Sequence, residues 1–290
     1  MSAPPVGPGV GRPGPSVISW VPAVPGLPVG DGARLLGGAE GRSQPPAVVS
    51  VDLWTLPEAE VPGFAERLGG IGVLAPEERH RMARFRSLGA RRRYLGGRLL
   101  ARHALSQVAG GDPADWRFLP GPHGKPRADP AGPHFNVSHT AGMVACVVSA
   151  HHRCGVDVER TRMLPEALTA LSRHLAPAER DALAEVPPER RSAEAAAYWV
   201  LKEAYLKGLG VGLLRALDSF AFTPPHRAQA VVCDPPERAR HDWQFDLLYP
   251  GPDHVVAAAV ESTRPIRPRL TRLSADHPDL PTPTRGHRRL

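Results

Sequence analysis

Between residues 47 and 261 the spacing of apolar residues changes from helical to strand-like twice, which limits the folds open to this chain. In each cycle, apolar residues three or four positions apart give way to short runs rich in β-branched residues. The two cycles are similar in length. They predict an α+β (α/β) fold of two halves packed against each other. We see no convincing repeat in the sequence itself.

The expected elements can be placed by their residue ranges. In the first half we expect helices at about 56–68, from about 76, and at 88–109, with strands at 48–54, 135–137 and 143–149. In the second half we expect a strand at 155–159, helices at 165–174, 177–184 and 189–208, and strands at 219–223, 243–248 and 254–260. The stretch 121–133 is rich in turn residues.

Both ends of the chain differ in composition from the middle. Residues 1–46 contain 10 Pro and 10 Gly, a proportion that predicts a disordered segment. Residues 262–290 contain 5 Pro, 7 Arg and 2 Asp without apolar periodicity, and we expect a flexible tail there. The core therefore divides into a first half at 47–150 and a second half at 151–261.

The formal net charge of +7 comes mostly from the ends, since the tail alone carries +5. A core close to neutral gives little support to a nucleic-acid or membrane partner. Inside the core, however, the segment Arg79 to Arg102 holds nine Arg and no acidic residue, which predicts an anion site or a basic face. A nucleic-acid-binding protein stays an alternative, although aromatic residues make up only 6% of the chain.

The cysteines and the apolar stretches indicate a cytoplasmic protein. Cys146, Cys154 and Cys233 have no CxxC spacing, so neither a disulfide framework nor a zinc site is expected. The first thirty residues lack the pattern of a signal peptide. The longest apolar runs fall far short of the ~20 residues that span a bilayer.

Two carboxylates stand two residues apart in the predicted strand at 155–159. Residues at this spacing point to the same face of a strand, so Asp157 and Glu159 project together. Carboxylates so close repel each other unless a cation lies between them, and Mg²⁺ takes such oxygen ligands. For this motif alone, a solvent-facing strand edge is the alternative.

The long helix predicted at 189–208 supplies charged groups for the same site. At 3.6 residues per turn, Glu203 and Lys207 fall on one stripe, and Lys202 lies beside Glu203. An ordinary surface pair is the alternative reading of this spacing. Together with Asp157 and Glu159, the helix offers the parts that a magnesium-dependent phosphoryl-transfer enzyme needs.

A third motif, FNVSHT, displays Ser138 and His139 next to a turn, and the upstream HGKP places Lys125 in another turn. A structural role is the alternative for a single histidine. A hydrolase triad is not indicated because GxSxG is missing. P-loop and kinase signatures are also missing, although another magnesium-dependent phosphoryl-transfer enzyme stays an alternative.

The strings GKP, FNVSHT, GVDVE and WVLKEAYLKGLG occur in this order over roughly residues 70–222. In this respect the chain resembles the 4′-phosphopantetheinyl transferases of the surfactin-synthetase type. The resemblance implies two pseudo-symmetric halves with the active site at their interface. It also implies transfer of the 4′-phosphopantetheine arm of coenzyme A to a serine of an apo acyl or peptidyl carrier protein, releasing adenosine 3′,5′-bisphosphate. Such an enzyme is expected to act as a monomer.

The resemblance also assigns roles to individual residues. The expected catalytic residues are Glu203, Lys207 and Asp157, with Mg²⁺ held by Asp157, Glu159 and Glu203. The residues expected to bind coenzyme A are Arg81, Lys125, Ser138, His139, Lys202 and Lys207. One departure is Glu78, which stands where the family pattern leads us to expect a basic residue.

Overall fold

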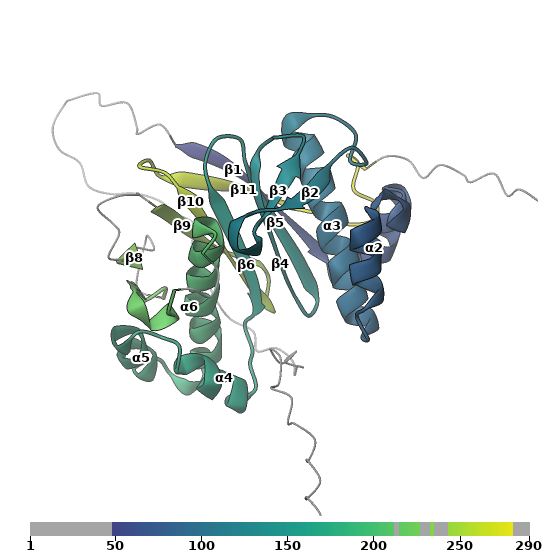
Figure 1. The fold of residues 1–290 in the computed structure, drawn as a ribbon. Coiled ribbons are helices and arrows are strands. Elements are labelled where there is room, and N and C mark those ends of the chain that lie inside the picture. Colours follow the sequence, from purple (N-terminus) through teal and green to yellow (C-terminus); the bar gives the residue numbers. More distant parts are fainter. Residues whose placement is uncertain (1–47, 212–214, 227–232, 235–242, 281–290) are drawn as a thin grey trace, which may run out of the picture.

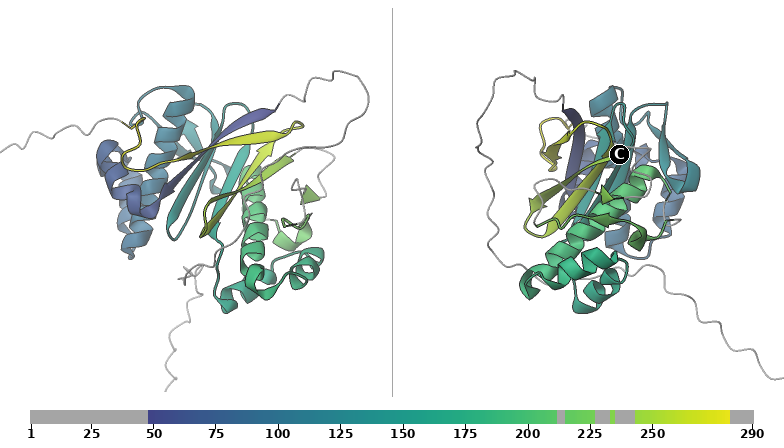
Figure 2. Two further views of the ribbon diagram at one scale, coloured as in Figure 1. Left: turned by 180° about the vertical axis from the view of Figure 1, so that it is seen from behind. Right: turned by 90° about the vertical axis from the view of Figure 1, so that its left-hand side faces the viewer.

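The computed structural model describes residues 48–211, 215–226, 233–234 and 243–280. Two β-sheets pack face to face, and helices cover the outer face of each (Figure 1). The views in Figure 2 show the same order of layers from behind and from the side. The predicted α+β fold of two halves is confirmed. Within the described ranges, no helix combines the length and the apolar character needed to cross a bilayer.

Each half contributes one sheet, one long helix and several short elements. The elements of the first half are β1 (Val49–Pro57), η1 (Glu58–Glu60), α1 (Val61–Arg67), η2 (Gly70–Val73), α2 (Pro76–Ala83), α3 (Leu88–Ala109), β2 (Arg117–Pro120), η3 (Pro122–Gly124), β3 (Pro126–Asp129), β4 (His134–Thr140) and β5 (Met143–Ser149). The second half contains β6 (Cys154–Arg160), α4 (Pro165–Ser172), α5 (Pro177–Ala184), α6 (Pro188–Leu209), η5 (Leu217–Ser219), β7 (Ala221–Phe222), β8 (Cys233–Asp234), β9 (Trp243–Gly251) and β10 (His254–Glu261). A last strand, β11 (Ile266–Arg272), follows them.

The two halves share one topology. The larger sheet has the order β11-β1-β5-β4, and the smaller sheet has the order β6-β10-β9. Apart from β11, each sheet has three strands. In each, the strand that comes last in the chain (β5 or β10) lies in the middle, between the first (β1 or β6) and the second (β4 or β9). All these neighbouring strands are antiparallel. The second half therefore repeats the first, in chain order as well as in space.

A short sequence repeat, which we did not recognise from the sequence, marks this duplication. The strings LAPEER and LAPAER begin α2 and α5. In each, the backbone N–H of the alanine donates to the glutamate three residues later, at 2.9 Å for Ala75 and Glu78 and at 2.8 Å for Ala176 and Glu179. Such a contact satisfies a free N–H at the start of a helix. The same capping has been kept in both halves.

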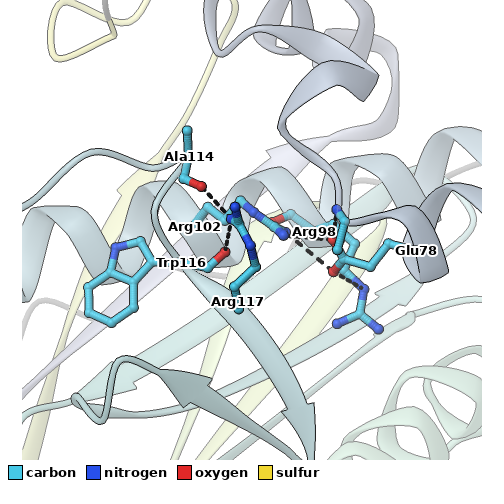
Figure 3. A network of polar contacts seen from close by, with 7 residues as sticks. Glu78, Arg98, Arg102, Ala114, Trp116 and Arg117 are labelled. Atoms are coloured by element: carbon cyan, nitrogen blue, oxygen red, sulfur yellow. Dashed lines mark hydrogen bonds and ion pairs between the residues drawn. The ribbon is translucent and has the colours of Figure 1, made fainter.

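Each capping glutamate also pairs with a buried cation on the long helix of its half. Arg102 Nη2 lies 2.6 Å from Glu78 Oε2, and Lys202 Nζ lies 2.8 Å from Glu179 Oε2. Figure 3 shows Arg98 and Arg102 converging on Glu78. Because α3 begins at residue 88 and α6 at residue 188, Arg102 and Lys202 occupy equivalent positions. Glu78 stands where a basic residue was expected. Its carboxylate caps α2 and neutralises Arg102, which accounts for an acidic residue at this position.

The C-terminal region differs from the expected flexible tail. Strand β11 pairs in parallel with β1, and Leu273 and Leu280 are buried in the core of the first half. Arg67 holds the segment by donating to the carbonyl oxygens of Ala275 and Leu280, at 2.8 and 2.9 Å. The expectation of a flexible tail was wrong for residues 266–280. The arginines and prolines of β11 give it the composition of a tail, but its side chains alternate in exposure as those of a strand do.

Two further expectations concern ranges elsewhere in the chain. The stretch 121–133, expected as turns, contains η3 and strand β3, which pairs with β2. The expected disorder of residues 1–46 and the last ten positions of the expected tail lie outside the described residues.

Candidate functional site

The facing edges of the two sheets, β4 and β6, are joined by side chains that alternate along the FNVSHT motif. Residues two apart on a strand share a face, so every second side chain of β4 points toward β6. The contacts are Val156 N to Asn136 Oδ1 at 2.9 Å, Ser138 Oγ to Asp157 Oδ1 at 2.6 Å, and Thr140 Oγ1 to Glu159 Oε1 at 2.7 Å. Sequence reasoning missed Asn136 and Thr140, although the alternation N-x-S-x-T carried the signal.

Two glycines bring helix α6 against strand β6. A Cβ atom on Gly155 would overlap the carbonyl oxygen of Ala204 and the backbone nitrogen of Gly208. The helix therefore approaches the strand more closely than any side chain between them would allow. This contact carries Glu203 and Lys207, which flank it on α6, to the face of β6 that bears Asp157.

Lys207 is the centre of a cluster drawn from both halves. Its Nζ atom lies 2.5 Å from Oδ1 of Asp157 and 3.0 Å from Oγ of Ser138. Asp157 and Ser138 are buried, whereas the Lys207 side chain is 30% exposed. An aspartate from β6, a serine from β4 and a lysine from α6 therefore form one hydrogen-bonded cluster at the interface between the halves.

The two glutamates next to this cluster have perturbed ionisation. Burial raises the pKa of Glu203 and of Glu159, and the negative charge of Asp157 adds to the rise in each. Lys207 partly offsets the rise for Glu203, and hydrogen bonds from the backbone N–H of Arg160 and from Thr140 do so for Glu159. Three carboxylates thus share one electrostatic environment.

A hard divalent cation fits this donor set, because all three carboxylates offer oxygen and a cation would relieve their mutual repulsion. In the part of the chain that the structure describes, no three carboxylate, imidazole or thiol groups are positioned as a ready metal site. One carboxylate oxygen of the set, Oδ1 of Asp157, is held by Lys207 instead.

His139 lies beside the cluster. Desolvation, together with the positive charges of Arg93 and Lys207, lowers its pKa, so the imidazole is neutral at pH 7. Arg93 donates to Glu58 at 2.9 Å, and Glu58 also accepts from the N–H of Gly142 in the turn after β4. Glu58 and Arg93 therefore fix the turn that follows β4, the strand that carries His139, a role that the sequence did not indicate.

Lys202 does not lie at the site, contrary to the expectation that it binds coenzyme A. Its side chain is 0% exposed, and its Nζ pairs with Glu179 and donates to the carbonyl oxygens of Leu217 and Phe220 at 2.8 and 2.6 Å. Adjacent residues of a helix project in different directions, so Lys202 points into the core while Glu203 faces the cluster. The structure assigns Lys202 to the core of the second half.

Lys125 and Arg81 make no hydrogen bond or ion pair with the Ser138–Asp157–Lys207 cluster among the described residues. Lys125 Nζ donates to the carbonyl oxygens of Cys154 and Gly208, at 2.9 and 3.0 Å, and its burial lowers its pKa. Lys125 therefore joins the end of α6 to the start of β6.

Arg81 is exposed on α2, with its guanidinium 6.0 Å from the ring centre of Tyr94. The Tyr94 hydroxyl is buried without a hydrogen-bond partner in the described residues.

The duplication places a counterpart of this site in the first half. The strings SVDL in β1 and GVDV in β6 are equivalent, because the valines of both line the core between the sheets. The positions equivalent to Asp157, Glu159, Glu203 and Lys207 are Asp52, Trp54, His103 and Gln107. These four residues line one cleft of about 400 Å³.

The counterpart cleft keeps the aspartate and loses both glutamates and the lysine. Its outer wall comes from the C-terminal segment, where Arg269 Nη2 lies 2.5 Å from Oδ1 of Asp52. The two sites thus share a backbone framework and differ in chemistry. Only the cluster around Lys207 retains three carboxylates.

Comparison with known proteins agrees with this architecture. Residues 153–259 match the 4′-phosphopantetheinyl transferase superfamily, and residues 62–152 match the N-terminal part of 4′-phosphopantetheinyl transferase. The chain is 31% identical to a phosphopantetheinyl transferase of Thraustochytrium sp. over 75% of its own length and 80% of the relative's. It is 29% identical to the 4′-phosphopantetheinyl transferase HetI of Nostoc sp. over 72% and 87% of the two chains.

A third relative is the 4′-phosphopantetheinyl transferase Sfp of Bacillus subtilis, 31% identical over 52% of this chain and 66% of that protein. A solved holo-(acyl-carrier-protein) synthase from Bacillus anthracis covers 39% of this chain and 95% of its own at 17% identity, with a TM-score of 0.33.

These matches identify the chain as a transferase built of two similar halves, with a polar cluster between them. The chain belongs to the 4′-phosphopantetheinyl transferase superfamily and is a transferase enzyme. The narrower surfactin-synthetase type stays a prediction.

Proposed function

We propose that this protein transfers the 4′-phosphopantetheine arm of coenzyme A to a serine hydroxyl of an apo acyl or peptidyl carrier protein and releases adenosine 3′,5′-bisphosphate. The observation that carries the proposal is the contact of Lys207 with Asp157 and Ser138, which joins both halves at one polar site. The activity of the family and the order of the motifs support it.

In the proposed reaction, the oxygen of the carrier serine bonds to the phosphorus atom next to the pantetheine arm. The bond from that phosphorus to the bridging oxygen of the pyrophosphate breaks, and the bisphosphate leaves with the bonding electrons. The serine proton goes to Glu203, the carboxylate that α6 brings to the face of β6 bearing Asp157. Lys207 stabilises negative charge on the phosphates.

Asp157, Glu159 and Glu203 would hold a divalent ion, which we propose to be Mg²⁺. When bound, such an ion neutralises charge on the pyrophosphate and favours departure of the bisphosphate. Ser138 and Thr140 orient the two carboxylates of β6 by donating to them. Neutral His139, next to the cluster, would accept or donate a hydrogen bond at the nucleotide end of coenzyme A. Arg81 and Lys125 are weaker candidates for its 3′-phosphate, since Lys125 already binds two carbonyl oxygens.

The test is intact-protein mass spectrometry of an apo carrier protein incubated with this enzyme, coenzyme A and Mg²⁺. The expected result is a gain of one phosphopantetheine group that is lost in EDTA. No gain on several acyl and peptidyl carriers, together with no binding of coenzyme A in calorimetry, would refute the proposal. A monomeric protein is expected in light scattering, because both halves of the site lie in one chain.

A further inference from the structure

We infer that Lys207 is the resident counter-ion of Asp157, that a divalent metal must displace it, and that the displaced lysine then serves the anionic substrate. The inference rests on the proposed function, since it concerns the metal at the same site. Beyond the proposed function, we infer that Lys207 and the metal compete for Asp157. We also infer that binding of the metal and binding of the substrate favour each other.

Asp157 is a buried carboxylate. The residue is 5% exposed, and a carboxylate so buried is stable only with a compensating charge or hydrogen bonds. Its oxygen Oδ1 has both kinds of partner. The positive charge comes from Lys207 Nζ at 2.5 Å, and a hydrogen bond comes from Ser138 Oγ at 2.6 Å. A metal ion bound to the same carboxylate would repel the ammonium group at this short range. The two cations therefore compete for the charge of Asp157.

The duplicated half provides an independent comparison. Asp52, the equivalent of Asp157, also has a cation at 2.5 Å, which is the guanidinium of Arg269 on β11. The helix of that half offers Gln107 where Lys207 stands in the other. Each half therefore pairs this aspartate with a cation, and the cation comes from a different element in each half.

After displacement, Lys207 would be free to bind an anion. Its side chain is 30% exposed, and its remaining hydrogen-bond partner is the neutral hydroxyl of Ser138. A displaced ammonium group at the mouth of the site would be attracted to a phosphate group that arrives there. Binding of coenzyme A should then favour metal binding, and by linkage the metal should favour coenzyme A.

The experiment is calorimetric titration of Mg²⁺ into the metal-free protein, with and without coenzyme A. We expect Lys207→Met to bind Mg²⁺ at least about fivefold more tightly than the wild type in the absence of coenzyme A, within the usual range of coupling between sites. The same variant should lose the gain in Mg²⁺ affinity that coenzyme A produces in the wild type. Lys207→Arg keeps the positive charge and should retain the weaker Mg²⁺ binding.

The matched control is Arg269→Met, which removes the resident cation from Asp52 in the duplicated half. It should leave the Mg²⁺ affinity unchanged, because Trp54 and His103 stand there in place of the two glutamates. Equal Mg²⁺ affinity in the wild type and Lys207→Met would overturn the inference and leave the proposed function intact. Absence of Mg²⁺ binding in every variant, even with coenzyme A, would overturn the inference together with the metal part of the proposed function.

Discussion

Gly155 of β6 and Gly208 of α6 lie backbone against backbone, with no side chain between strand and helix. Both glycines belong to the sequence motifs that also contain the charged residues of the site. Their contact sets the distance between the strand that bears Asp157 and the helix that bears Lys207. The glycines of these motifs are therefore needed for geometry, while the chemistry lies in their charged neighbours.

Substitution Gly155→Ala should destabilise the protein and disrupt the cluster. The added methyl group overlaps the backbone of α6, which cannot move as a flexible side chain could, so we expect a loss of about 1–3 kcal/mol in the free energy of unfolding. Urea denaturation measures the loss. Gly251→Ala is the control, since a Cβ there meets no atom within 4 Å. Equal losses for both variants would contradict the close contact.

Substitution Asp157→Asn or Glu203→Gln should reduce transfer without unfolding the protein. Removing a general base or a metal ligand costs on the order of 10²–10⁴ in rate. The rate is measured by mass spectrometry of the carrier at saturating Mg²⁺, with thermal melting to check the fold. Glu66→Gln on the exposed side of α1 is the control. Near wild-type turnover of Asp157→Asn or Glu203→Gln would remove that residue from the catalytic set.

Substitution Lys202→Met should affect stability and leave coenzyme A affinity unchanged. It leaves the buried carboxylate of Glu179 without its cation, which costs about 3–5 kcal/mol. The double variant Lys202→Met, Glu179→Gln removes both charges and retains an oxygen to cap α5, so it should recover part of the loss. Chemical denaturation and calorimetry with coenzyme A give the two readouts. A folded Lys202→Met that binds coenzyme A weakly would return Lys202 to the site.

The stability of the protein should fall between about pH 6.5 and pH 4 because of His103. Burial, with a contribution from nearby His277, lowers the pKa of His103 to about 4, below the ordinary 6.5 of the unfolded chain. The unfolded state binds the proton first, so this stabilisation is complete above pH 6.5 and is lost as the pH falls toward 4. The full effect is about 3 kcal/mol.

Denaturation curves over this pH range test the effect with His103→Gln. This variant should lose less stability between pH 7 and pH 4 than the wild type does. His80→Gln, at an exposed position of α2, should follow the wild type. Identical pH profiles for His103→Gln and the wild type would show that His103 is protonated equally in both states.

The sequence predicts those elements whose own residue pattern is enough to specify a helix or a strand. Helix α3 lies at residues 88–109 as its apolar stripe indicates, and β5 at 143–149 as its β-branched run indicates. Strand β11 could not be predicted, because its composition is that of a tail and only its pairing with β1 makes it a strand. The strings LAPEER and LAPAER are too short to indicate a duplication by themselves. They do so in the structure because both cap equivalent helices, α2 and α5.

The sequence by itself determined the family, the two halves, and the association of GVDVE with the long helix, because period and motif are local properties of the chain. The tertiary structure decided which charged residues meet. It placed Lys207 beside Asp157 and Lys202 in the core, although Lys202 is the lysine adjacent to Glu203 in the sequence. The physical reason is the helix period. A shift of one residue turns a side chain by about 100°, and only the packed core determines which direction faces the other half.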